Sequence, residues 1–346
     1  ISGQRWESAR YFIALIRENE YQTGHLLGVA ILEYLLGSAE ELHDLHLASP
    51  EDPLPMMGLA RLAIEDSQPD EARELLTKAV EIDPTLLEAQ AWLGHLLLDD
   101  ADVEGLRQWR AHLPKNAKDH PEIWAVQGRW AQRNGDIRGA VRCYVEALRR
   151  DANHIRGATT IPVLLRGLRE HTLAEPFAER SQNLIRFHES AARVRSDLER
   201  LSFQKETASA AQSLGRLWEA LAWYHQVLMK NPNDAVARDA HSRLKRQLTP
   251  AMPQTDPASN PALVFDVSKW PLPEWFSDDL ELKDQATPAS VADSSVRFVD
   301  LAQHVGIDFQ YVNGADPSRV GTRIYEVDGG GVGILDYDAD GWPDIY

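Results

Sequence analysis

The chain has 346 residues, with 36 Lys and Arg against 53 Asp and Glu, so its formal net charge is −17. A protein that binds free nucleic acid needs a basic surface to neutralise phosphates, so this charge argues against a nucleic-acid partner. Hydrophobic residues at 43% and charged residues at 26% are typical of globular proteins and exclude disorder along the whole chain.

The acidic residues are unevenly distributed along the chain. From residue 249 onward there are 17 Asp and Glu against 5 Lys and Arg, and nine of the 19 prolines lie there too. The length predicts about two domains, and this change in composition places a boundary near residue 249. The longest apolar stretch, residues 26–36, contains Glu33 and is shorter than the roughly 20 residues of a membrane helix, so we expect no transmembrane segment. The chain starts at Ile1 rather than Met, and we interpret this start as processed or truncated.

A 34-residue period divides the next part of the chain into three units, residues 53–86, 87–120 and 121–154. The eighth position of each unit is small, which lets a partner helix approach closely: Ala60, Gly94 and Gly128. Position 24 reads Leu76, Arg110 and Tyr144. The departure at Arg110 predicts that the second helix of the middle unit is offset or shortened.

Further helical segments flank these units. Residues 201–234 follow the same pattern but are out of phase by 12 residues, so residues 155–200 are predicted to be a degenerate helix pair with an insertion. We expect a helix to start at Ile161-Pro162 within it. Residues 234–247 are predicted to be a closing cap helix, and residues 1–52 to be capping helices that extend the stack.

The spacing resembles the tetratricopeptide repeat, and the third unit matches that pattern best, at Trp124, Gly128, Gly135, Ala140, Tyr144 and Ala147. The resemblance implies a mainly α fold, a solenoid of helix pairs over residues 53–248, with a groove that binds a protein or peptide. Position 9, which lines the groove in this family, carries a basic row: Arg61, His95 and Arg129. We expect this row to meet a carboxylate-rich or phosphorylated peptide, or alternatively to be solvated or paired within the surface.

Residues 249–295 have the Pro- and Asp-rich composition of a linker. An apolar cluster within it, Leu263 to Phe265 with Trp270, Trp275 and Phe276, is expected to fold back onto a neighbouring surface. That many large apolar side chains would be a liability in a free linker.

Four carboxylates are closely spaced near the end of the sequence, within loop 336–344. Asp336, Asp338, Asp340 and Asp344 occupy positions 1, 3, 5 and 9 of this loop, with Gly at position 6. With the backbone carbonyl of Trp342 at position 7, they offer the oxygen ligands that Ca²⁺ prefers. The apolar run 332–335 precedes the loop and residues 344–346 begin another strand, so we expect a strand–loop–strand site and not an EF-hand.

Residues 296–346, from Phe298-Val-Asp300 through Gly329-Gly330-Gly331 to the acidic loop, are similar to the entry of the FG-GAP/VCBS propeller in ASPIC/UnbV-type proteins. The resemblance implies the first strands of a truncated calcium-binding β-propeller, with the five loop residues above as calcium ligands. It also implies an extracytoplasmic location.

Catalytic residues are not expected. The single cysteine, Cys143, has no paired base nearby in the sequence, and His43 and His46 lack a third metal ligand. The sequence therefore predicts a non-enzymatic interaction scaffold with a calcium-binding module for adhesion or assembly. The alternative is a docking arm of a larger enzyme whose catalytic part lies beyond residue 346.

Overall fold

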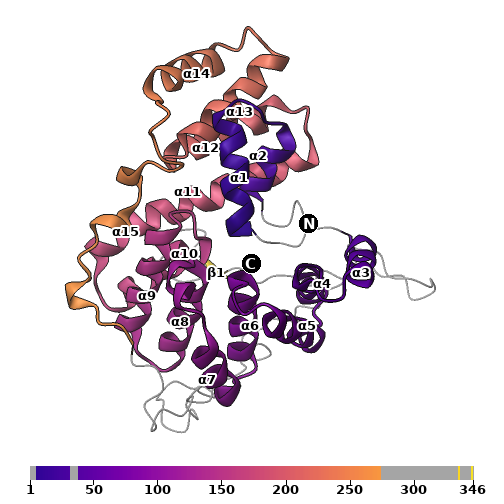
Figure 1. Ribbon diagram of the computed structural model, residues 1–346. Helices are drawn as coiled ribbons and strands as arrows, with labels where there is room; N and C mark the ends of the chain where they lie inside the picture. The colour runs from indigo at the N-terminus through magenta and orange to yellow at the C-terminus, as the bar shows by residue number, and fades with distance from the viewer. Residues whose placement is uncertain (1–4, 32–37, 274–333, 336–343, 346) are drawn as a thin grey trace. The chain divides into compact units, whose positions relative to one another are not determined.

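The computed structural model describes residues 5–31, 38–273, 334–335 and 344–345. The chain forms two compact units, residues 1–286 and 287–346. In the first unit, residues 5–31 and 38–273 are helical and contain no strand (Figure 1).

The helices of the first unit follow one another with short turns. The first seven are α1 (Arg5–Arg17), α2 (Thr23–Ala30), α3 (Ala39–Ala48), α4 (Pro53–Glu65), α5 (Pro69–Ile82), α6 (Leu87–Asp99) and α7 (Val103–His112). After a 3₁₀ turn, Lys115–Asp119, come α8 (Pro121–Arg133), α9 (Ile137–Arg150), α10 (Ile155–Gly167), α11 (His171–Ser196), α12 (Leu201–Ser213), α13 (Leu217–Lys230) and α14 (Ala235–Gln247). The first helix of each repeat (α4, α6, α8, α10, α12) is called an A helix below, and the second (α5, α7, α9, α11, α13) a B helix.

The same turn joins the A and B helices of all five pairs. Position 15 of each unit has left-handed backbone, at Ser67, Ala101, Gly135, Arg169 and Gly215. The next residue donates its N–H to the carbonyl five residues earlier, as in the 2.9 Å bond from Asp136 N to Ala131 O. The α1–α2 turn has the same geometry at Asn19, so the N-terminal helices form a further hairpin of this type.

The degenerate unit is a complete helix pair. Its second helix, α11, has 26 residues where α9 has 14, and this difference of 12 accounts for the phase shift of the following unit. The expectation that a helix starts at Ile161-Pro162 was wrong, because α10 starts at Ile155, where the His154 side chain caps Gly157 N, and Pro162 lies inside it. A proline there removes one backbone hydrogen bond without ending the packed helix.

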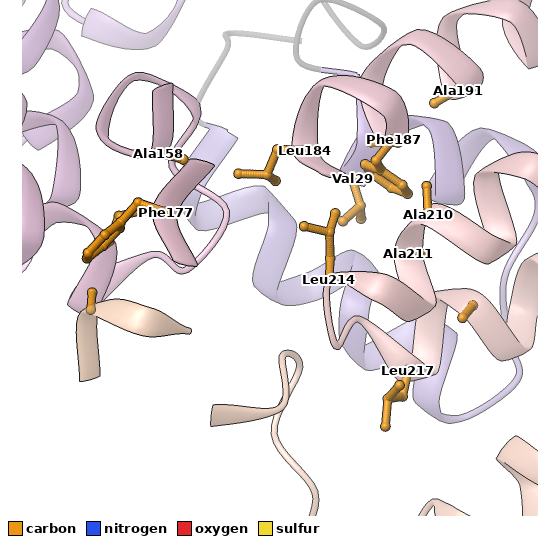
Figure 2. Close-up of a cluster of buried hydrophobic side chains, with 14 of the residues drawn as sticks. Val29, Ala158, Phe177, Leu184, Phe187, Ala191, Ala210, Ala211, Leu214 and Leu217 are labelled. Carbon is orange, nitrogen blue, oxygen red and sulfur yellow. The ribbon is translucent and has the colours of Figure 1, made fainter. Parts of the chain in front are cut away.

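The N-terminal hairpin packs on B helices far along the chain. α1 contacts α13, and α2 contacts α11 and α13, whereas α3 packs on α4 (Figure 1). Val29 of α2, Phe187 of α11 and Leu214, which follows α12, point into the same buried space (Figure 2). A second hydrophobic cluster is built from residues of α4 to α8. The hairpin of α1 and α2 therefore lies against the later repeats and not in front of the first.

Residues 252–273, called the strap below, are packed and contain only single turns, namely Pro257–Ser259, α15 (Pro261–Val264) and Val267–Lys269. α15 packs on α9. Phe265 and Trp270 are buried, as expected for a segment that folds back, but Leu263 and Val264 are exposed. Trp275 and Phe276 lie outside the described residues.

In the second unit, two short strands form an antiparallel pair, β1 (Ile334–Leu335) and β2 (Asp344–Ile345). Ile334 pairs with Ile345, and Leu335 with Asp344. These are strands that the sequence predicted on either side of the acidic loop. The rest of the expected propeller entry lies outside the described residues.

Candidate interaction surface on the A helices

The position-9 row lies on three successive A helices, with Arg61 on α4, His95 on α6 and Arg129 on α8. Arg61 and His95 are buried, and the Arg129 side chain is 20% exposed. The Arg61 guanidinium stacks over the ring of Trp92, 5.0 Å from its centroid. The three residues therefore occupy successive A helices, and most of the row is covered.

His95 and Arg129 are paired within the chain. His95 Nε2 lies 3.3 Å from Glu122 Oε2, and Arg129 Nη1 donates to His95 Nδ1 at 3.1 Å. Because an arginine only donates, Nδ1 of His95 accepts, and its proton lies on Nε2, facing Glu122. Arg129 also forms an ion pair with Asp99.

A ladder of glutamate–histidine pairs runs along the repeats beside this row. Glu88 Oε2 lies 3.2 Å from His120 Nε2, and Glu122 Oε1 lies 3.1 Å from His154 Nε2. In both pairs the glutamate is at position 2 and the histidine at position 34 of one unit. His154 Nδ1 accepts from Gly157 N, so its proton also faces the glutamate. Sequence reasoning missed this ladder, although the repeat frame contains the spacing that would have revealed it.

The electrostatics of the ladder centre on Glu122. Burial alone would raise the pKa of Glu122, but His154 and His95 together hold it well below its usual range. Burial lowers the pKa of His95, and the positive charges of Arg156 and Arg129 lower it further, against the opposing effect of Glu122. His95 is thus stabilised in its neutral form.

Two arginines on α8 and α10 form no ion pair with a carboxylate among the described residues. Arg156, at position 2 of the α10 unit, is exposed, and no carboxylate of residues 38–273 lies within ion-pair distance of it. Arg133 Nη1, on α8, is buried and has no hydrogen-bond partner in the described part of the chain. Positive charge is therefore in excess at α8 and α10.

A cavity of about 410 Å³ opens beside the ladder. Its walls include Glu88, His120 and Glu122, together with Trp6 of α1 and Thr255 of the strap. The ring of Trp6 packs edge-on against His120, with centroids 5.2 Å apart. Arg61, His95 and Arg129 do not line this cavity.

The other residues that the sequence singled out lie elsewhere in the chain. Cys143 is fully buried in α9. His43 and His46 lie on α3, and in the described ranges no group of three or more His, Cys, Asp or Glu side chains is arranged to hold a metal ion. Asp336, Asp338, Asp340 and Trp342 lie outside the described residues, and Asp344 is in β2.

Residues 63–129 match the tetratricopeptide repeat family. The match confirms, for this part of the chain, the resemblance to the tetratricopeptide repeat seen in the sequence. No curated protein matches the chain.

Several solved structures are similar to the chain. The TPR protein YrrB, described as having an unusual peptide-binding site, is 15% identical, with coverage of 59% of this chain and 100% of its own and a TM-score of 0.32. The thermophilic TPR protein TTC0263 of Thermus thermophilus is 18% identical, with coverage of 56% and 99% and a TM-score of 0.33. A chain of the APC/C hetero-tetramer Cut9–Hcn1 is 16% identical, with coverage of 70% and 46% and a TM-score of 0.37.

Among the described residues, no helix has the length and apolar character needed to cross a membrane.

Proposed function

We propose that the helical unit is a protein–protein interaction scaffold that binds an acidic segment of a partner on its A helices. The tetratricopeptide repeats of residues 63–129 support the scaffold role. The chemistry of the ligand follows from one break in the repeating pattern of charges.

That break is at Arg156. In the preceding step of the repeat, the position-9 residue His95 meets the position-2 carboxylate of Glu122, 27 residues later. One step further, the position-9 residue is Arg129 and the residue 27 positions later is Arg156, so an arginine stands where a carboxylate stood before. The positive charges of both arginines lower the pKa of His95, so the three residues belong to one electrostatic cluster. A carboxylate from a partner would supply the missing acid, and phosphate would suit the same arginines.

The test is binding of a fluorescein-labelled octaglutamate peptide to the whole chain, followed by fluorescence anisotropy. We expect binding that weakens with salt and is lost in Arg156→Glu, whereas Arg193→Glu, on α11 and paired with Glu206, leaves it unchanged. Absence of binding, or equal binding by Arg156→Glu, would contradict the proposal.

The second unit is proposed to be the start of an FG-GAP/VCBS module that binds Ca²⁺ through Asp336, Asp338, Asp340, the Trp342 carbonyl and Asp344. The β1–β2 pairing supports this, because it joins Leu335 to Asp344 and so brings the two ends of the acidic loop together. A bound Ca²⁺ would offset the repulsion among four carboxylates of one loop.

Isothermal calorimetry with CaCl₂ tests this part of the proposal on the whole chain. We expect binding in the micromolar to millimolar range that is lost in Asp338→Ala and kept in Asp316→Ala, an acidic residue outside the loop. Equal heats for the two variants would contradict it. Extracellular calcium modules bind at the upper, near-millimolar end of this range, so we also propose an extracytoplasmic location. Fractionation of the native host cells would test it.

A further inference from the structure

Side chains of the helices hold the strap by donating hydrogen bonds to its backbone carbonyls. Arg149 donates from Nε to Ala262 O at 3.0 Å and from Nη2 to Phe265 O at 3.1 Å. Arg142 donates from Nη1 to Val267 O and Trp270 O, at 3.3 and 3.1 Å. All four contacts go to backbone carbonyls, and Val267 O also accepts the N–H of Trp270 within the strap, at 3.0 Å.

The same pattern continues toward the start of the strap. Arg180 of α11 donates to Ser259 O at 2.7 Å, and Asp256 N donates to Gly215 O at 2.9 Å. Asn260 is 4% exposed and donates to Leu148 O, at the end of α9, at 2.8 Å. The strap therefore runs from the α12–α13 turn back along α9.

Side chains at a regular spacing anchor the strap. Asn260, Phe265 and Trp270 follow one another at intervals of five residues, and all three are buried. The Phe265 ring packs edge-on against Phe177, 5.6 Å between centroids, and Arg138 lies over the ring of Trp270 at 5.1 Å. Buried anchors combined with backbone recognition are how a protein surface binds an extended peptide.

We propose that the face of α9 and α11 is a peptide-binding site, and that the strap is its built-in ligand, bound reversibly. The chemistry it selects is an extended segment with a buried Asn followed by two aromatic residues at five-residue spacing. The short connection from α14 keeps the strap at a high effective concentration, so the site is filled in the intact chain. This site is on the B helices and does not depend on the acidic-peptide proposal for the A helices.

The experiment uses the whole chain with a site for a specific protease inserted between Pro250 and Ala251, which are exposed, and a tag at the N-terminus. After cleavage, the fraction of the C-terminal fragment that stays with the tagged helices is measured. We expect the fragment to be retained, and to be displaced by excess synthetic peptide 252–273 but not by the reversed sequence.

Arg149→Lys tests the hydrogen bonds to the strap separately from the positive charge. Lysine keeps the charge that pairs with Glu146, but it lacks the planar guanidinium that donates to two carbonyls at once. We expect it to weaken retention about tenfold, the loss expected for one or two hydrogen bonds, and Trp270→Ala to do the same. Arg193→Lys is the matched control. Immediate loss of the wild-type fragment, failure of excess peptide to displace it, or unchanged retention in Arg149→Lys would each overturn the proposal.

Discussion

The indole ring of Trp109 lies directly against Gly94, so that a Cβ atom on Gly94 would be 2.7 Å from Cζ2 of Trp109. The ring of Tyr144 is 3.0 Å from the corresponding position on Gly128. Each contact joins the A and B helices of a single repeat, α6 with α7 and α8 with α9. Trp109 is at position 23 of its repeat, one residue before the position that Tyr144 occupies in the next.

Gly94→Ala is expected to destabilise the protein, because overpacking costs about 1–3 kcal/mol and the gain in helix propensity returns only about 1 kcal/mol. Gly128→Ala is expected to cost less than Gly94→Ala. Gly167→Ala is the control, since nothing lies within 4 Å of its Cβ position, and it should be neutral or slightly stabilising. Urea unfolding measures all three, and a neutral Gly94→Ala would show that Trp109 can move aside.

Gly135 and Ala101 test the repeated turn independently of packing. Gly135 has φ of 77° and nothing within 4 Å of its Cβ position, so Gly135→Ala should cost about 1–2 kcal/mol from backbone conformation alone. Ala101 has φ of 56°, and Ala101→Gly should stabilise by less than about 1 kcal/mol, because glycine also gains entropy in the unfolded chain. Thermal unfolding of both variants gives the answer, and shifts of the same sign would contradict this reading of the turn.

The period of 34 residues was enough to predict the helix pairs, and Arg110 correctly indicated an altered middle unit, since α7 is short and Trp109 takes the packing position. The strap and the α1–α2 hairpin were harder. Their positions depend on contacts between residues far apart in the chain, such as Arg149 with Phe265, and no local pattern encodes these. The left-handed position of each turn is occupied by Ser, Ala, Gly or Arg, so residue type did not reveal it.

Arg216 and Glu219 form a fully buried ion pair in which Nε donates to Oε1 at 2.8 Å. Arg216 also donates to Val29 O of α2 and stacks on Phe187, so it ties the N-terminal hairpin to α11 and α13. Glu219→Gln should cost about 3–5 kcal/mol, because it leaves the guanidinium buried without a counter-charge. The exposed pair of Glu74 and Lys78 is the comparison, and Glu74→Gln should have no measurable effect on urea unfolding. Similar losses in both variants would contradict the assignment.

Cys143 should be unreactive in the folded protein. Its side chain is fully buried, and this burial raises the pKa of the thiol far above its usual value. The negative charge of Asp136 raises the pKa of the thiol further, by a smaller amount. Ellman's reagent should detect no thiol in native buffer and one per chain in denaturant. A native reaction at the rate of a free thiol would contradict a packing role and reopen the question of chemistry at this residue.

Stability should fall as the pH falls below neutrality, because of His95. The pKa of folded His95 is lowered by burial below its usual 6.5, so between these two values the unfolded chain binds a proton that the folded chain does not. The stability that neutral His95 contributes is therefore fully present above pH 6.5 and is lost as the pH decreases. His241, whose pKa burial also lowers, acts in the same direction, and Glu122 adds a second loss below its usual value of 4.5.

The measurement is the free energy of unfolding in urea at about pH 7.5 and about pH 5.5. This range includes the pH at which the histidine of the unfolded chain takes up its proton, and it stays above the range in which Glu122 does so. His95→Gln lowers stability at both pH values by removing the bond to Glu122, but its loss between the two should be smaller than that of the wild type. His112→Gln, an exposed residue on α7, should keep the wild-type dependence. Equal pH dependence in the wild type and His95→Gln would show that protonation of His95 is not linked to folding.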